Sequence, residues 1–170
     1  MLVVETQVEQ GWPTTVDWVA LADDACRAAL AETPHGWLDQ ESFAVEVSVR
    51  LTSDAEVHSL NAHYRDKDRP TNVLSFPMVQ PDLIEGLSNS DDGEILLGDI
   101  VLAAGVCAAE AADKKVAIET HATHLVVHGL LHLLGFDHEQ GEAEAEAMEA
   151  IERVALARLG ISDPYAVSES

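Results

Sequence analysis

Positively charged residues are scarce in this chain. Only 9 Lys and Arg stand against 31 Asp and Glu in 170 residues, which gives a net charge of −22 with histidine neutral. Proteins that bind nucleic acid over a wide surface neutralise phosphates with Lys and Arg. The composition therefore argues against broad, sequence-independent binding to DNA, although it leaves room for one local cationic spot.

Cysteines and long apolar runs are also few. The opening segment, MLVVETQVEQGW, has neither the basic start nor the apolar run of a secretory signal, and no later window reaches the apolar length of a membrane span. We therefore expect a cytoplasmic protein without membrane partners. Cys26 and Cys107 lie in separate apolar helical patterns without a CxxC partner, so we expect buried thiols and no disulfide framework.

Hydrophobic periodicity predicts one α+β domain that spans residues 1–170. A hydrophobic content of 47% is ample for a packed core. Short or alternating apolar runs predict strands at 2–8, 43–51, 71–77 and 94–103. Helical spacing predicts helices at 14–32, 54–64, 103–113, 117–134 and 142–160. Because strands come early and helices late, we expect about five helices packed on one small mixed sheet of about four strands.

Particular side chains are expected to cap these helices or to face the core. A Thr precedes the first helix and Ser53 precedes the second, and both residue types cap helices through their side-chain oxygens. Apolar residues that recur at helical spacing are expected to face inward, while glutamates cover the rest of the last helix. These residues are Val57, Leu60 and Tyr64 in the second helix and Met148, Ile151, Ala155 and Leu159 in the last.

Two segments outside the regular elements bear on function. MVQPDLIEGLSNSDDG, residues 78–93, is too irregular for a helix or strand. A loop of that length is either inert surface or functional, here as a flap over a site. The turn YRDKDRP holds three of the nine cations, at Arg65, Lys67 and Arg69. Its charge alone favours a solvated surface turn, and contact with phosphate is the alternative.

The segment HGLLHLLGFDH, residues 128–138, places three histidines in apolar surroundings. His128 and His132 are four positions apart on a predicted helix, so they project from one face. Gly135 can end that helix with a positive φ, and the chain can then reverse and return His138 to the pair. Three neutral imidazoles leave a fourth position open, as in a catalytic zinc site. We expect one Zn²⁺ ion per chain on these three residues.

This spacing is that of the metzincin zinc peptidases, with one change. Where those enzymes carry a general-base Glu beside the first ligand, this chain has Gly129. Peptide hydrolysis then lacks the group that deprotonates the attacking water, whereas a cation behind neutral ligands suits an anionic oxygen such as a phosphate. His121 and His124 extend the same helical face, and we interpret them as core histidines, with a role beside the metal or substrate as the alternative. Asp137 either caps the turn, which we prefer, or orients a histidine.

These motifs together resemble the YbeY family of bacterial endoribonucleases. HGLLHLLGFDH matches the family pattern HGxLHLxGxDH, and further matches lie in LNAHYRDKDRPTNVLSFP at 60–77, in GDI at 98–100 and at Met148. The resemblance covers about residues 43–160. At position 72 the chain has Asn where many relatives have Asp.

The resemblance implies roles for four residues. It implies that His128, His132 and His138 bind zinc, and that Arg65 is the functionally important arginine of the family. A guanidinium group suits this role because its planar fork makes two charge-assisted hydrogen bonds to a phosphate.

The resemblance also implies an activity and partners. The activity is zinc-dependent, single-strand-specific cleavage of RNA in rRNA processing, at the 3′ end of 16S rRNA, and in ribosome quality control. The expected partners are RNA, the small ribosomal subunit and its proteins, without DNA. Since the acidic chain would bind free RNA weakly, basic ribosomal proteins would help to target it. Two alternatives stay open: a zinc hydrolase of peptides or small molecules, and a non-catalytic zinc-containing ribosome assembly factor.

Overall fold

The structure is a computed structural model, and it describes residues 1–87, 94–136 and 141–165. Four strands and five α-helices lie close to their predicted positions, and two 3₁₀ helices are added. In chain order the elements are β1 (Leu2–Val8), α1 (Trp18–Ala31), η1 (Gly36–Gln40), β2 (Ala44–Thr52), α2 (Asp54–Arg65), β3 (Val73–Pro77), η2 (Pro81–Gly86), β4 (Glu94–Ala103), α3 (Ala104–Lys114), α4 (Ile118–Leu133) and α5 (Glu142–Arg158).

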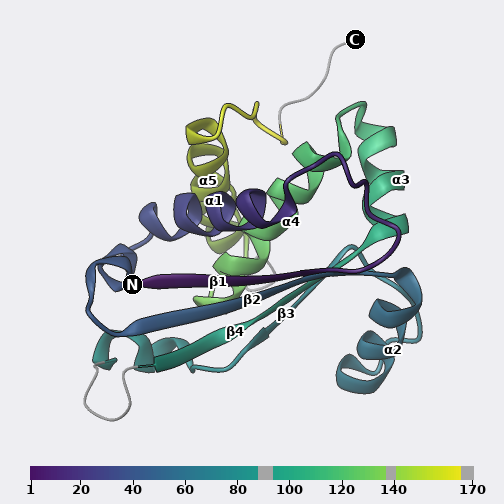
Figure 1. Cartoon of the computed structure of the whole chain (residues 1–170). Helices are drawn as coiled ribbons and strands as arrows, with labels where there is room; N and C mark the ends of the chain where they lie inside the picture. The colour runs from purple at the N-terminus through teal and green to yellow at the C-terminus, as the bar shows by residue number, and fades with distance from the viewer. Residues whose placement is uncertain (88–93, 137–140, 166–170) are drawn as a thin grey trace.

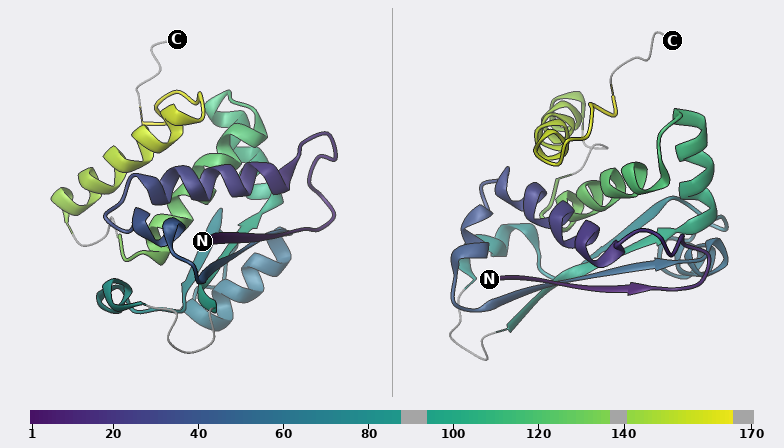
Figure 2. Two further views of the ribbon diagram at one scale, coloured as in Figure 1. Left: turned by 60° about the vertical axis from the view of Figure 1, so that its left-hand side comes forward. Right: turned by 45° about the horizontal axis from the view of Figure 1, so that its top comes forward.

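The four strands form one mixed sheet in the order β1-β2-β4-β3. β1, β2 and β4 are parallel, and β3 is antiparallel to β4. Helices α1 and α4 lie across one face of this sheet (Figure 1), and α5 packs against both of them on the side away from the strands (Figure 2). The predicted α+β class with a small mixed sheet is therefore confirmed.

Helix α2 packs on the opposite face of the sheet. Side chains alternate between the two faces of a strand, and in β4 Ile100 belongs to the main core whereas its neighbour Val101 does not. Val101 forms a second, smaller cluster with Val57 of α2 and Leu74 of β3. One end of the sheet is therefore covered on both sides, which fixes α2 and the turn that follows it.

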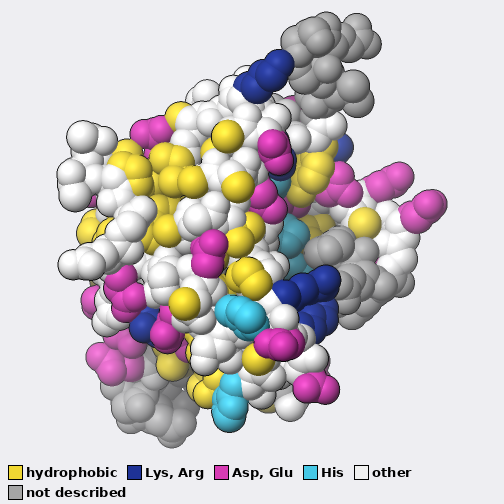
Figure 3. Space-filling model, turned by 90° about the vertical axis from the view of Figure 1, so that its right-hand side faces the viewer, with side chains coloured by type: hydrophobic (Ala, Val, Ile, Leu, Met, Phe, Trp, Pro, Cys, Tyr) yellow, Lys and Arg dark blue, Asp and Glu magenta, His cyan; other side chains and the backbone are white. Residues whose placement is uncertain are grey.

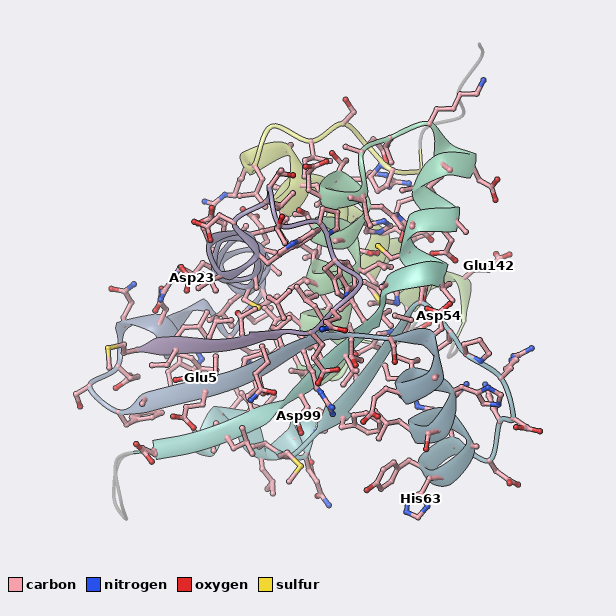
Figure 4. All side chains as sticks on the ribbon, turned by 45° about the vertical axis from the view of Figure 1, so that its right-hand side comes forward. Glu5, Asp23, Asp54, His63, Asp99 and Glu142 are labelled. Carbon is pink, nitrogen blue, oxygen red and sulfur yellow. The ribbon has the colours of Figure 1, made fainter. Side chains whose placement is uncertain are left out.

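Side-chain caps position two of the helices at this end. Ser53 caps α2 as predicted, since its hydroxyl accepts a hydrogen bond from the Glu56 N–H at 3.2 Å. Helix α3 has no cap from its own N-cap residue. Instead Asp54 reaches across from α2 (Figure 4) and accepts from the N–H of Gly105 at 2.8 Å. A carboxylate at a helix N-terminus is stabilising, so this bond ties α3 to α2.

Two local predictions are wrong. Helix α1 begins at Trp18 with Asp17 as its cap, and not with a Thr. The Asp17 carboxylate accepts from the Ala20 N–H at 3.1 Å, a geometry that Asp provides as well as Thr does. Tyr64 is 64% exposed and does not face the core. It lies in the last turn of α2, where its ring meets Phe76 edge-on at 5.5 Å.

The segment 78–87, the described part of the expected loop 78–93, contains regular structure that its sequence does not suggest. Pro81 begins the 3₁₀ helix η2, and Ile84 within it is completely buried. Proline fixes φ at the first helical position, and burial of Ile84 anchors the turn to the main core. This part is therefore not a free flap, while residues 88–93 lie outside the described part of the chain.

Both cysteines are buried, as predicted. Burial raises the pKa of the Cys26 and Cys107 thiols to about 12, and a protonated thiol is a poor nucleophile. We therefore expect the native chain not to react with Ellman's reagent near neutral pH. The same chain unfolded in guanidinium chloride should release one chromophore for each of its two cysteines. A native chain that reacts as fast as the unfolded chain would contradict this expectation.

Among the described helices, none has the length and apolar character needed to cross a membrane.

Candidate metal centre

Helix α4 carries four histidines along one side. His121, His124, His128 and His132 follow each other at spacings of three and four, so their rings lie one above another. Neighbouring rings meet edge-on, with centroids 6.1, 6.4 and 4.5 Å apart along the helix. The other faces of α4 are buried and largely apolar. The core therefore holds this helix firmly.

His128 and His132 converge on one point. Their Nε2 atoms are 2.9 Å apart, and both side chains are partly buried. Two nitrogens bound to one tetrahedral zinc ion lie about 3.3 Å apart, so small ring rotations would fit the pair to a metal. His138, the expected third ligand, and Asp137 lie outside the described residues. Within residues 1–87, 94–136 and 141–165, no three potential ligands are grouped to hold a metal ion.

Gly135 ends helix α4 as predicted. Its φ is +98°, a value that favours glycine. Its N–H donates to the His132 carbonyl at 3.1 Å, and the Phe136 N–H donates to the Leu131 carbonyl at 3.0 Å. These two bonds form a Schellman motif. The motif therefore ends α4 at Leu133, with Leu134 as its C-cap, close in sequence to His132.

Gly129 faces the sheet and not the histidine pair. A Cβ atom at this position would lie 2.7 Å from Cγ2 of Ile100 and 3.3 Å from Oγ of Ser75. Real Cβ contacts are not this short, so α4 can pack this closely on β3 and β4 only with glycine here. The absence of the metzincin carboxylate at position 129 is therefore a packing requirement as well as a chemical difference.

Glu152 on α5 is a site residue that sequence reasoning missed. Its side chain is wholly buried, so the prediction that the glutamates of this helix cover its exposed faces is wrong at this position. Glu152 lies four residues after Met148 and three before Ala155, which are both buried in the core. The sequence did contain a signal for this residue, namely a glutamate at a position of the apolar stripe. A carboxylate at such a position is buried and therefore needs hydrogen-bond or charge partners.

Three donors surround the Glu152 carboxylate. Its Oε1 lies 2.9 Å from Nε2 of His124 and 3.1 Å from Nδ1 of His128, and its Oε2 accepts from the Tyr165 hydroxyl at 2.8 Å. Burial alone would raise the pKa of the Glu152 carboxyl, but the hydrogen bonds from His124 and His128 outweigh it and lower the pKa to about 2. Burial and the nearby Glu152 charge raise the pKa of the Tyr165 phenol well above its usual value.

His121 has a separate carboxylate partner. Its Nε2 lies 2.8 Å from Oε1 of Glu110 on α3, and Glu110 also accepts from the Asn72 side-chain amide at 3.0 Å. Burial lowers the pKa of His121 although the Glu110 bond opposes this shift. These side chains line a cavity of about 280 Å³ that extends along α4 to His128 and Tyr165. His121, His124 and His128 therefore border a space open to a ligand.

Arg65 is linked to helix α4 through β3. Its Nη2 donates to the Ser75 carbonyl at 3.1 Å, and the Ser75 hydroxyl donates to the Gly129 carbonyl at 3.3 Å. Arg65, Lys67 and Arg69 are exposed, as the sequence predicted for this turn. Figure 3 shows Lys and Arg side chains beside histidines on this face of the molecule. The end of α2 and the turn after it therefore bring three cations together, with Asp66 and Asp68 between them, in an acidic protein.

A comparison with protein families shows to which family the chain belongs. The family model described as Endoribonuclease YbeY matches residues 14–160. The chain belongs to the YbeY family. Three proteins named Endoribonuclease YbeY illustrate the similarity. The chain is 62% identical to the one from Rhizorhabdus wittichii over 99% of both chains, 59% identical to the one from Sphingopyxis alaskensis over 98% of both, and 51% identical to the one from Novosphingobium aromaticivorans over 98% of both.

The YbeY match begins earlier in the chain than the motifs alone indicated. It includes α1 and η1, which precede the range of about residues 43–160 that the motif resemblance covered. A solved structure supports the fold independently. The solution structure of a Thermotoga maritima protein aligns with a TM-score of 0.55 at 21% identity, covering 97% of this chain and all of that one. At this identity the likeness bears on the fold alone.

Proposed function

We propose that this YbeY protein is a zinc-dependent endoribonuclease that cleaves single-stranded RNA during rRNA processing, at the 3′ end of 16S rRNA, and in ribosome quality control. One observation carries the proposal. The Nε2 atoms of His128 and His132 converge to 2.9 Å, and His128 also lines a cavity, in a chain 62% identical to a protein named Endoribonuclease YbeY.

The residues present fit a zinc ion. His128 and His132 would hold it through Nε2, with His138 as the third ligand that the sequence predicts. A zinc ion bound there would polarise a phosphoryl oxygen or lower the pKa of a water molecule toward about 7. All three ligands are neutral, so the ion would keep its full charge for an anionic substrate. The apolar residues of α4 limit access of bulk water and so strengthen electrostatic interactions at the site.

Arg65 would act on the substrate phosphate. Its bond to the Ser75 carbonyl uses one of its five N–H donors, which leaves others for phosphate oxygens. A guanidinium group would offset the negative charge that builds on the non-bridging oxygens of the phosphate as the new bond forms. Gly129 supplies no general base, which favours a phosphate substrate over a peptide.

The same proposal includes partners and location. The substrate would be rRNA, bound where the basic turn meets the histidines, with the small ribosomal subunit and its proteins as partners. A net charge of −22 repels free RNA, so basic ribosomal proteins would attract the rest of the surface. We place the protein in the cytoplasm, where ribosomes mature.

The proposal is tested with the zinc-loaded chain on three substrates: a single-stranded RNA, the same sequence as a duplex, and a peptide panel. We expect cleavage of the single strand alone. Peptide hydrolysis without RNA cleavage would favour a zinc hydrolase of another class. If no substrate is cleaved and chelation of the metal unfolds the chain, a non-catalytic assembly factor is the better interpretation.

Replacing Arg65 with Ala tests the role of the guanidinium group. We expect kcat/KM for RNA cleavage to fall about 10²–10³-fold, because the charge at the phosphate loses its partner. Zinc content should stay unchanged, and thermal stability should fall only slightly, since the exposed side chain gives up one hydrogen bond to the Ser75 carbonyl. Arg65→Lys should recover only part of the loss, because an ammonium lacks the planar fork.

Lys67→Ala is the matched control, because this cation lies in the same exposed turn. It should reduce cleavage only about two- to three-fold, through weaker general attraction of RNA. Equal losses in Arg65→Ala and Lys67→Ala would show that the turn attracts RNA without a specific contact from Arg65.

A further inference from the structure

The Glu152 carboxylate lies behind the expected metal ligand His128. Nδ1 of His128 is 3.1 Å from Oε1 of Glu152, and the opposite ring nitrogen, Nε2, is 2.9 Å from Nε2 of His132. The hydrogen-bond distance from Nδ1 to this carboxylate oxygen points to a hydrogen on Nδ1, since a carboxylate oxygen is an acceptor. In the neutral ring, Nε2 then keeps its lone pair, on the side where the two histidines converge.

We propose that Glu152 is a positioning residue for the metal ligand His128, fixing both the orientation of its ring and the tautomer that can bind a metal. This inference rests on the proposed zinc site and goes beyond it, since no comparison assigns a role to Glu152. Metal-bound histidines commonly donate their second N–H to a carboxylate, which orients the ring and makes it a better ligand.

The surroundings of Glu152 fix the carboxylate itself. The side chain has no exposed surface, and His124 and Tyr165 donate to it from α4 and from the segment after α5. With these two donors in place, the carboxylate is not free to turn away from His128. The position of α5 therefore fixes the Glu152 carboxylate, and the carboxylate fixes the orientation of the His128 ring on α4.

A purely structural role is the competing interpretation. Glu152 could serve only to join α5 to α4, as Glu110 joins α3 to the same helix through His121. In that case the loss of the carboxylate would lower stability and leave the remaining zinc affinity and the His128 tautomer unchanged. The two interpretations therefore differ in measurements made without RNA.

The test compares Glu152→Gln with Glu110→Gln, which removes the same kind of histidine–carboxylate bond from a histidine outside the expected ligand set. Zinc affinity is measured by competition with a chromophoric chelator. We expect Glu152→Gln to bind zinc about 10- to 100-fold more weakly, and Glu110→Gln to stay within about two-fold of the parent chain. Equal affinities for the Glu152→Gln and parent chains would overturn the proposal.

A second measurement does not depend on any variant. In the zinc-free parent chain at slightly alkaline pH, ¹⁵N NMR of the histidine rings should show His128 with its hydrogen on Nδ1. A hydrogen on Nε2 would overturn the proposal even if Glu152→Gln fails to fold. Loss of the proposed RNA cleavage is a separate result, since a chain that binds zinc as expected but cuts no RNA would leave the role of Glu152 intact.

Discussion

Replacing His132 with Ala is expected to abolish both zinc binding and RNA cleavage. The variant removes one of the two nitrogens that lie 2.9 Å apart, and the remaining expected ligands are too few for a stable site. We expect the purified variant to hold almost no zinc and to cleave RNA at least about 10³-fold more slowly. Metal analysis by mass spectrometry and a gel assay of cleavage measure the two effects.

The control for this variant is His58→Ala. His58 is a half-exposed histidine on α2 that pairs with Asp68, so the chemical change is the same but lies away from α4. This control should keep full zinc content and activity. Zinc retained at the parent level in His132→Ala would refute the assignment of His132. Loss of folding is excluded by comparing thermal unfolding of the zinc-free chains.

Gly129→Glu is expected to prevent folding although it restores the carboxylate of the metzincin peptidases. The new Cβ would meet Ile100 at 2.7 Å, and the carboxylate would be forced between α4 and the sheet, where the Ser75 hydroxyl is the polar group nearest to that Cβ. Overpacking and an unpaired buried charge together should lower the free energy of unfolding by more than about 4–5 kcal/mol. That loss is comparable to the whole stability of many domains. Circular dichroism and guanidinium unfolding measure it.

Gly129→Ala is the graded form of the same experiment. It adds only the Cβ. We expect overpacking to lower the free energy of unfolding by about 1–3 kcal/mol, and the better helix propensity of Ala to offset part of this loss. Gly86→Ala is the control, because no atom of residues 1–87, 94–136 and 141–165, apart from those of its chain neighbours, lies within 4 Å of the Cβ it would add. A folded Gly129→Glu chain would show that α4 does not need to pack this closely on the sheet.

Features encoded by neighbouring residues could be predicted from the sequence. The pairing of His128 with His132 follows from helical spacing, and the helix end at Gly135 follows from its conformational freedom. The cap at Ser53 follows from its hydroxyl. Each of these depends on residues within about one turn of helix, so no knowledge of the tertiary structure is needed.

Contacts between distant segments could not be predicted in the same way. His128 and Glu152 are separated by 24 positions, and only the packing of α5 on α4 brings them together. The prediction for Tyr64 failed for a related reason. Helical periodicity continues to the end of α2, but the small cluster that α2 covers around Val57 does not extend to its last turn. Periodicity alone does not show where the partner surface ends.

The dependence of His128 on Glu152 has a consequence for the order in which the protein matures. Helix α4 precedes α5 in the chain, so it leaves the ribosome first during synthesis. Until α5 has emerged and docked, the His128 ring has no carboxylate behind it and its metal-binding nitrogen is not fixed. Under the proposed role of Glu152, a nascent chain would carry an unfinished zinc site, and RNA cleavage near the ribosome would be delayed until α5 has emerged and docked.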